Sequence, residues 1–142
     1  MSQEQTLETI PVDALLDKVR ELREKGCRLV QIGATRLPEQ LELTYSFDLD
    51  CRLTSLRLQL PVPQPRVPSI TAIYGCAVLY ENEMHDLFGL QVDGMALDFQ
   101  GNFYRTAVKY PFASTKAPVA RPAAPAAPAP ASTASAAAAP PK

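Results

Sequence analysis

The sequence predicts an α+β fold: a two-layer sandwich in which two helices cover a three-stranded antiparallel sheet. Two stretches with helical spacing of apolar residues bracket three strand-like stretches. At Ala113 the composition changes to alanine and proline. We therefore expect one folded α+β domain over residues 1–112 and a disordered Ala/Pro-rich tail over residues 113–142. A body of about 100 residues is long enough to bury its own core.

The first predicted helix covers Val12–Lys25. Pro11 suits the first turn of a helix, and Gly26 suits the position after its end. Charged residues separate the apolar residues, which recur every three or four positions at Val12, Leu15, Leu16, Val19 and Leu22. The helix is therefore amphipathic, and we expect it to lie on an apolar surface.

Three strands are predicted next. Arg28–Ala34 has some alternation, and Leu41–Leu49 has the clearest, because every second residue is apolar and the residues between are polar. This pattern suits an antiparallel sheet with one buried face and one face in water. In the third strand, Leu53–Leu60, the first leucine is out of phase with the later ones, which predicts a bulge near Thr54–Ser55.

The second predicted helix covers Ile70–Leu87. Four prolines between residues 61 and 68 predict an extended connection before it. Ser69 is the expected N-cap, and Gly89 is expected to end the helix. A short strand-like piece, Leu90–Val92, follows.

A helical wheel of this second helix places one carboxylate inside an apolar arc. Glu81 lies near the middle of the arc, His85 lies near its edge, and Glu83 and Asp86 face away. The arc itself consists of the apolar residues Ile70, Ile73, Tyr74, Ala77, Met84 and Phe88. A carboxylate in an apolar environment is costly unless it is paired or protonated, so we expect Glu81 to have a partner.

Three interpretations of these polar residues compete. Glu81 and His85 are four residues apart and could bind a metal, but His85 is the only histidine in the chain. They could also act as general acid and base, but no nucleophile or phosphate-binding loop accompanies them. The favoured interpretation is structural: the carboxylates bind arginine or backbone N–H groups, within the fold or at an interface. We therefore predict no catalytic, cofactor-binding or metal-binding residue in this chain.

Composition excludes several further classes. The formal net charge of −1 gives no reason to expect nucleic acid as a partner. The three cysteines, Cys27, Cys51 and Cys76, are far apart, which argues against a zinc or iron–sulfur site and favours reduced thiols. No secretory signal and no apolar run long enough for a membrane helix is present, so we expect membrane contact only through partners.

The end of the predicted domain is basic and aromatic. Every acidic residue lies at or before Asp98. The segment from residue 99 to residue 112 combines Phe103 and Tyr104 with Arg105 and Lys109, a mixture that suits an interface. The alternative is that these aromatic side chains fold back on the chain's own sheet.

The second helix resembles a known family. The run Pro68-Ser69-Ile70-Thr71, then Tyr74, then Glu81-x-Glu83-x-x-Asp86-Leu87-Phe88-Gly89 resembles the 30-kilodalton subunit of respiratory NADH dehydrogenase, which is complex I. The resemblance covers residues 10–112, and the signature is long and specific.

Two departures from that family's pattern stand out. Asn82 stands where the signature usually has arginine. The stretch from Asp93 to Phe112 replaces the arginine-rich and H-P-L-R-K-D-Y-P-like ending of the complex I protein with a shorter one. This shorter ending looks more like the equivalent subunit of energy-converting, membrane-bound nickel–iron hydrogenases.

The resemblance implies a non-catalytic assembly subunit in the cytoplasmic arm of a hydrogenase complex that couples ferredoxin oxidation and proton reduction to ion translocation. It implies no cofactor in this chain, because the nickel–iron site and iron–sulfur clusters belong to the large and small partner subunits. The location implied is peripheral, on the cytoplasmic side of the cell membrane. The residues expected at interfaces or in the structural signature are Glu81, Glu83, His85, Asp86, Phe88, Gly89, Phe103, Tyr104, Arg105 and Lys109.

Two alternatives stay open at this point. One is the 30-kilodalton subunit of an NADH:quinone oxidoreductase (complex I), with complex I homologues as partners. The other is a freestanding adaptor, whose folded body binds one partner and whose tail tethers another.

Overall fold

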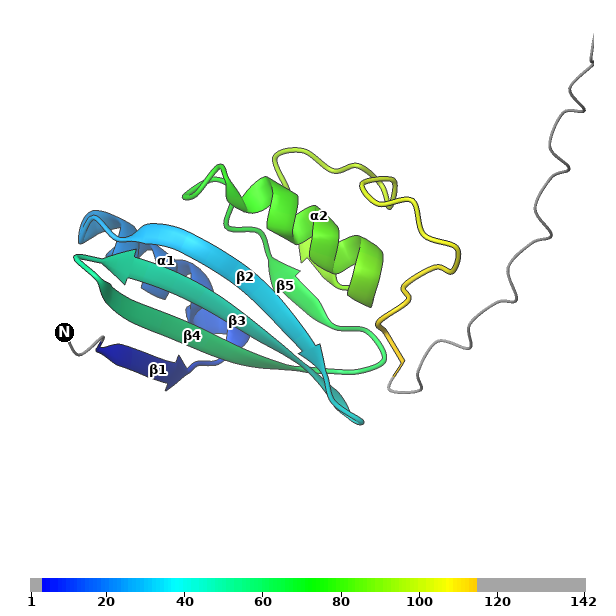
Figure 1. The fold of residues 1–142 in the computed structure, drawn as a ribbon, viewed down its shortest axis with the longest axis horizontal. Helices are drawn as coiled ribbons and strands as arrows, with labels where there is room; N and C mark the ends of the chain where they lie inside the picture. The colour runs from blue at the N-terminus through cyan, green and yellow to red at the C-terminus, as the bar shows by residue number, and fades with distance from the viewer. Residues whose placement is uncertain (1–3, 115–142) are drawn as a thin grey trace, which may run out of the picture.

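The computed structural model describes residues 4–114, which form a four-stranded mixed sheet, a two-stranded sheet and two α-helices (Figure 1). The elements in chain order are β1 Gln5–Thr9, a 3₁₀ turn Val12–Ala14, α1 Leu15–Glu24, β2 Arg28–Arg36, β3 Gln40–Leu49, β4 Arg52–Pro61, β5 Arg66–Pro68, α2 Ala77–Phe88 and β6 Gln91–Asp93. The mixed α+β class predicted from the sequence is confirmed. The predicted tail lies outside the described residues.

The antiparallel meander β2–β3–β4 follows the predicted order. Alternate residues of β3, from Leu41 to Phe47, are buried, and they pair across the sheet with Leu60, Leu58, Leu56 and Thr54 of β4. The same alternation leaves the other face of the sheet polar, with Ser46 and Ser55 hydrogen-bonded at 3.1 Å between their Oγ atoms. The clear period-two pattern therefore predicted the central strand correctly.

The prediction of three strands was wrong, because a fourth strand, β1, pairs with β4 in parallel register from Gln5↔Leu53 to Thr9↔Arg57. Every residue of β1 is exposed. The strand therefore has no buried face and no apolar alternation that the sequence could reveal. Its pairing comes from backbone hydrogen bonds, which any residue except proline can make.

The predicted bulge near Thr54–Ser55 is also wrong. The register of β3 with β4 runs without a break, and Leu53 simply pairs with Asp48 on the polar face. The irregularity lies in β2 instead, between Leu29 and Gln31. A half-buried leucine on an open face is an ordinary occurrence, so its phase was no evidence for a bulge.

The second helix begins at Ala77, seven residues later than predicted, and the segment from residue 70 to residue 76 forms turns. Ser69 is therefore not its N-cap; that position is Cys76, which makes no side-chain cap bond. Tyr74 holds the turns in place, because its hydroxyl donates to the Cys27 carbonyl at 2.7 Å and its ring packs on Phe47. The prediction that Gly89 ends the helix is confirmed, with φ of 72°.

β5 and β6 form a small parallel sheet beside α2. The Arg66 guanidinium makes two hydrogen bonds to the Asp93 carboxylate, at 2.6 and 2.7 Å, across this pair. β6 corresponds to the short strand predicted at Leu90–Val92. β5 lies in the proline-rich stretch that was predicted only as an extended connection.

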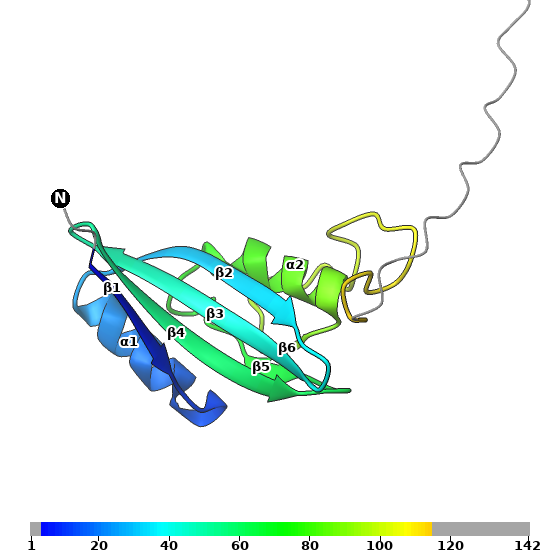
Figure 2. The ribbon, with the colours of Figure 1, turned by 60° about the horizontal axis from the view of Figure 1, so that its bottom comes forward.

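Both helices lie on the same side of the four-stranded sheet, α1 toward the β1 edge and α2 toward the β2 edge (Figure 2). One continuous core joins the layers, with Leu15, Val19 and Leu22 from α1 and Ala77 and Met84 from α2 packed into it. Among the described residues, no helix is long and apolar enough to cross a membrane.

Candidate functional site

α2 is buried on two opposite faces, not one. Ala77, Glu81 and Met84 face the core, as the helical wheel predicted. Asn82 and Asp86, on the other side, are also buried. They are covered by residues 94–114, here called the C-terminal loop, which runs along the outer side of α2 (Figure 1). Asp86 lies on the side of α2 opposite the core, as the helical wheel predicted, but this loop covers it, so the expectation that it is free to meet another chain was wrong.

Glu81 has its partners within the chain. Its carboxylate accepts hydrogen bonds from the Ser69 hydroxyl at 2.6 Å and from the Ile70 N–H at 2.8 Å, and the residue is only 2% exposed. Burial raises the pKa of the Glu81 carboxyl above its ordinary value, and the two hydrogen bonds offset this rise only in part. Glu81 thus ties α2 to the turn that precedes it.

Asn82 fastens the C-terminal loop. Its Nδ2 donates to the carbonyls of Val78, at 2.8 Å, and Leu97, at 2.9 Å, and its Oδ1 accepts from the Phe99 N–H at 3.0 Å. The side chain is fully buried. An amide can accept and donate at once, which an arginine at this position could not do.

Asp86 also holds the C-terminal loop against α2. Its Oδ2 accepts from the Tyr104 N–H at 2.7 Å. Its Oδ1 is buried and has no hydrogen-bond partner among residues 4–114. A Cβ atom at Gly101 would lie 3.9 Å from this Oδ1 and 4.0 Å from His85 Nε2, so the loop backbone passes close to both side chains.

His85 and Gly89 hold the end of the loop. His85 Nδ1 lies 2.8 Å from the Leu90 carbonyl oxygen, and because a carbonyl only accepts, Nδ1 carries the proton. The His85 and Tyr110 rings lie in an edge-to-face arrangement, with centroids 5.9 Å apart and an interplanar angle of 71°. A Cβ atom at Gly89 would lie 3.1 Å from the Tyr110 ring, so both the positive φ and the close approach favour glycine here.

Phe88 and Glu83 border a separate groove between α2 and β2. The Phe88 ring packs against Phe112, with centroids 5.6 Å apart, and the Phe112 N–H donates to the Leu87 carbonyl. Glu83 is half-buried at this groove, whose volume is about 330 Å³. Phe112, the last aromatic residue of the segment from residue 99 to residue 112, therefore packs on α2.

The middle of the C-terminal loop faces solvent. Phe103 packs between Phe99 and Tyr104, with centroid distances of 5.4 and 4.9 Å, while Tyr104 itself is 42% exposed. Arg105 and Lys109 are exposed. They border an open depression of about 490 Å³, whose walls also include His85 and Asp98. Of the predicted interface residues, the structure thus brings Tyr104, Arg105, Lys109 and His85 around one hollow.

No three His, Cys, Asp or Glu side chains among residues 4–114 are arranged to hold a metal ion. In the same part of the chain Cys27 is buried, Cys51 and Cys76 are exposed, and all three are free thiols.

Comparison with known proteins gives the family. Residues 8–111 match the family described as the 30 Kd subunit of respiratory-chain NADH dehydrogenase. This chain belongs to that family. The resemblance inferred from the Glu81–Gly89 signature is therefore confirmed.

Two solved structures share the fold of this 30-kilodalton-family chain. One is a chain in the membrane-bound sulfane sulfur reductase, an archaeal respiratory membrane complex, with a TM-score of 0.61 and 24% identity over 70% of this chain and 64% of that chain. The other is a trypsin-resistant fragment of Nqo5, with a TM-score of 0.55 and 23% identity over 63% of this chain and 79% of that one. Among curated proteins, none matches this chain.

Two features of this family member were not anticipated from its sequence. Asn82 was noted only as a departure from the signature, and Ser69 only as a helix cap. Both instead make side-chain hydrogen bonds to residues distant in the chain. Polar amide and hydroxyl side chains do not contribute to the periodic pattern of apolar residues. Their hydrogen-bond partners can therefore be identified only in the folded protein.

Proposed function

We propose that this 30-kilodalton-family chain is a non-catalytic structural subunit of an energy-converting hydrogenase. In this proposal it belongs to the cytoplasmic arm of a complex that couples ferredoxin oxidation and proton reduction to ion translocation. The nickel–iron site and the iron–sulfur clusters belong to the large and small partner subunits, and this chain touches the membrane only through partners.

The observation that carries the proposal is the use of the signature residues. Glu81, Asn82 and Asp86 are all buried, and each accepts a hydrogen bond from the chain's own backbone. Glu81 holds the turn before α2, while Asn82 and Asp86 hold the C-terminal loop, so these side chains are not free to transfer protons to a substrate. The C-terminal loop presents exposed aromatic and cationic residues, which suit an assembly surface.

The hydrogenase branch is supported by the stretch from Asp93 to Phe112, which is shorter than the corresponding stretch of the complex I pattern and forms most of the C-terminal loop. Asn82, in place of the family's arginine, makes hydrogen bonds to this shorter loop at Leu97 and Phe99. Asn82 and the shortened C-terminal loop, the two departures from the complex I pattern, are therefore in direct contact. The alternative, the 30-kilodalton subunit of an NADH:quinone oxidoreductase, is supported by the family match and by the likeness to Nqo5.

The test is purification of an affinity-tagged full-length chain from native membranes, followed by identification of its partners. We expect a hydrogenase large subunit and an iron–sulfur small subunit. Recovery of NADH dehydrogenase subunits alone would move the chain to complex I. A soluble monomer without membrane-associated partners would favour the freestanding adaptor.

A further inference from the structure

The C-terminal loop concentrates the exposed apolar surface of the protein. Among residues 4–114, eight large hydrophobic residues are exposed, and five of them lie within this loop: Leu97, Phe99, Tyr104, Val108 and Phe112. Exposed apolar side chains gathered on one segment are typical of a segment that contacts another molecule.

Two exposed cations of the same loop, Arg105 and Lys109, border the depression together with Tyr104. Neither Arg105 nor Lys109 makes an ion pair within residues 4–114, and the Lys109 ammonium lies over the Tyr110 ring, 5.0 Å from its centroid. Asp98 is the one carboxylate at the depression, and its Oδ1 accepts the Gln100 N–H at 2.7 Å. Since no acidic residue follows Asp98 in the sequence, the segment after it has no carboxylate to pair with these cations.

A partner that covers Tyr104 would also remove water from Arg105 and Lys109, because all three side chains border the same depression. A charge that loses its water without gaining an opposite charge is strongly unfavourable. The partner must therefore bring its own carboxylates to this position.

We propose that the depression between Arg105 and Lys109 receives an acidic segment of a partner protein, whose apolar residues pack on Tyr104 and Val108. This inference deepens the proposed function, since it names the chemistry of the surface by which the chain assembles. It does not depend on whether the partner is a hydrogenase or a complex I homologue.

The first experiment reverses the charges of Arg105 and Lys109 in the tagged full chain, which is then purified from native membranes with its partners. Arg105→Glu with Lys109→Glu should lower partner recovery about tenfold or more, because the acidic segment is then repelled. The matched control, Arg20→Glu with Arg52→Glu, makes the same change in net charge at two exposed positions outside the loop, and it should keep recovery near that of the wild type. Equal recovery by the loop variant, or equal loss in the control, would overturn the inference.

The second experiment identifies the contact directly and does not depend on charge reversal. A photo-crosslinking amino acid replaces Val108, which is 62% exposed, and the crosslinked peptide is sequenced. A peptide rich in Asp and Glu is the expected result, and a neutral or basic peptide, or no crosslink to protein, would overturn the inference. Capture of an acidic segment of an NADH dehydrogenase protein would contradict only the hydrogenase assignment.

Discussion

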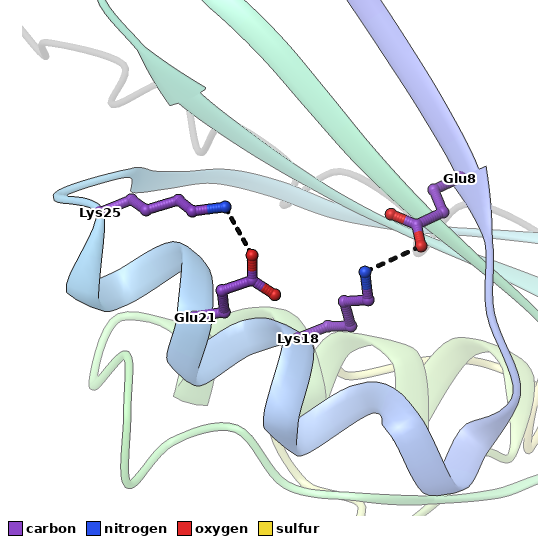
Figure 3. Close-up of polar contacts among 4 residues, drawn as sticks. All are labelled: Glu8, Lys18, Glu21 and Lys25. Atoms are coloured by element: carbon purple, nitrogen blue, oxygen red, sulfur yellow. Dashed lines mark hydrogen bonds and ion pairs between the residues drawn. The ribbon is translucent and has the colours of Figure 1, made fainter.

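The two ends of the molecule use charged residues in different ways. At the β1–α1 corner, Lys18 pairs with Glu8 at 3.0 Å and Lys25 pairs with Glu21 at 2.5 Å, all on the surface (Figure 3). These pairs lie at the rim of a cavity of about 350 Å³. Around α2 the arrangement is reversed: Glu81 and Asp86 are buried and accept hydrogen bonds from backbone N–H groups, while the nearby cations Arg105 and Lys109 are exposed.

This difference separates charges that stay in water from charges that organise structure. An exposed ion pair contributes little, because water and salt screen it. A buried carboxylate that accepts backbone hydrogen bonds fixes the position of the segment it binds, and its loss leaves those donors unsatisfied. The α2 region should therefore be sensitive to substitution, and the β1–α1 corner should not.

Glu81→Ala should have the largest effect. It leaves the Ser69 hydroxyl and the Ile70 N–H without their acceptor in the interior, so we expect the free energy of unfolding to fall by about 3 kcal/mol. Urea denaturation measures this change. The control is Glu83→Ala on the same helix, which is half-exposed and should change the value by about 0.5 kcal/mol or less. Equal losses of stability in the two variants would show that the buried hydrogen bonds of Glu81 do not stabilise the fold more than the half-exposed Glu83 does.

Gly89→Ala should follow, with a loss of about 2 kcal/mol, because a left-handed φ and the Tyr110 ring both oppose a Cβ atom. Gly94→Ala is a matched control: its φ is 79°, but a Cβ atom there would meet nothing within 4 Å. Gly94→Ala should therefore cost only the backbone strain, about 1 kcal/mol. Thermal unfolding measures the stability lost in each variant. Identical losses in Gly89→Ala and Gly94→Ala would exclude a role for the Tyr110 contact.

Asn82→Ala should cost about 1–2 kcal/mol and should act mainly on the C-terminal loop, because it removes two of the hydrogen bonds that fasten the loop. Hydrogen exchange at the Phe99 amide should speed up while the amides of β3 stay protected. Asn102→Ala, which removes only exposed hydrogen bonds within the loop, should leave Phe99 exchange unchanged. Unaltered exchange in Asn82→Ala would show that the loop is held by other contacts.

Stability should also depend on pH through Glu81. Its pKa in the folded protein lies above the ordinary value of 4.5, so the folded state holds this proton more tightly than the unfolded state does. Its contribution to stability is therefore fully present below pH 4.5 and is lost as the pH rises through the raised pKa. Denaturation of the wild type and of Glu81→Gln across this range tests the sign; parallel pH curves for the two proteins would contradict it.

Lys18→Ala should have the smallest effect. The Glu8–Lys18 pair, which joins β1 to α1, raises the pKa of Lys18, but both side chains are exposed. Unfolding should be the same as in the wild type within error, and only the amides of β1 should exchange faster. A stability loss as large as that of Asn82→Ala would show that the corner organises structure as α2 does.

The elements that were predictable have a repeating pattern of burial. β3 alternates because one face of the sheet is in the core, and α1 has an apolar stripe because one side lies on that sheet. Gly89 was predictable because a helix end with positive φ favours glycine. In each case the local backbone geometry determines which residue types suit each position, and this preference is visible in the sequence.

The features that escaped prediction depend on neighbours distant in the chain. β1 is paired along its length with β4, and the turns before α2 include Tyr74, whose hydroxyl binds the distant Cys27 carbonyl. The burial of Asp86 depends on the C-terminal loop, which has no regular period of its own.

The amino-acid pattern alone was enough for the fold class, the central strands and the family signature, because these follow from burial periodicity and from a long specific motif. Only the tertiary structure decided what packs over the polar residues on the outer side of α2. The environment of a polar side chain depends on the segment that packs over it, and for Asn82 and Asp86 that segment lies 15 to 18 residues further along the chain.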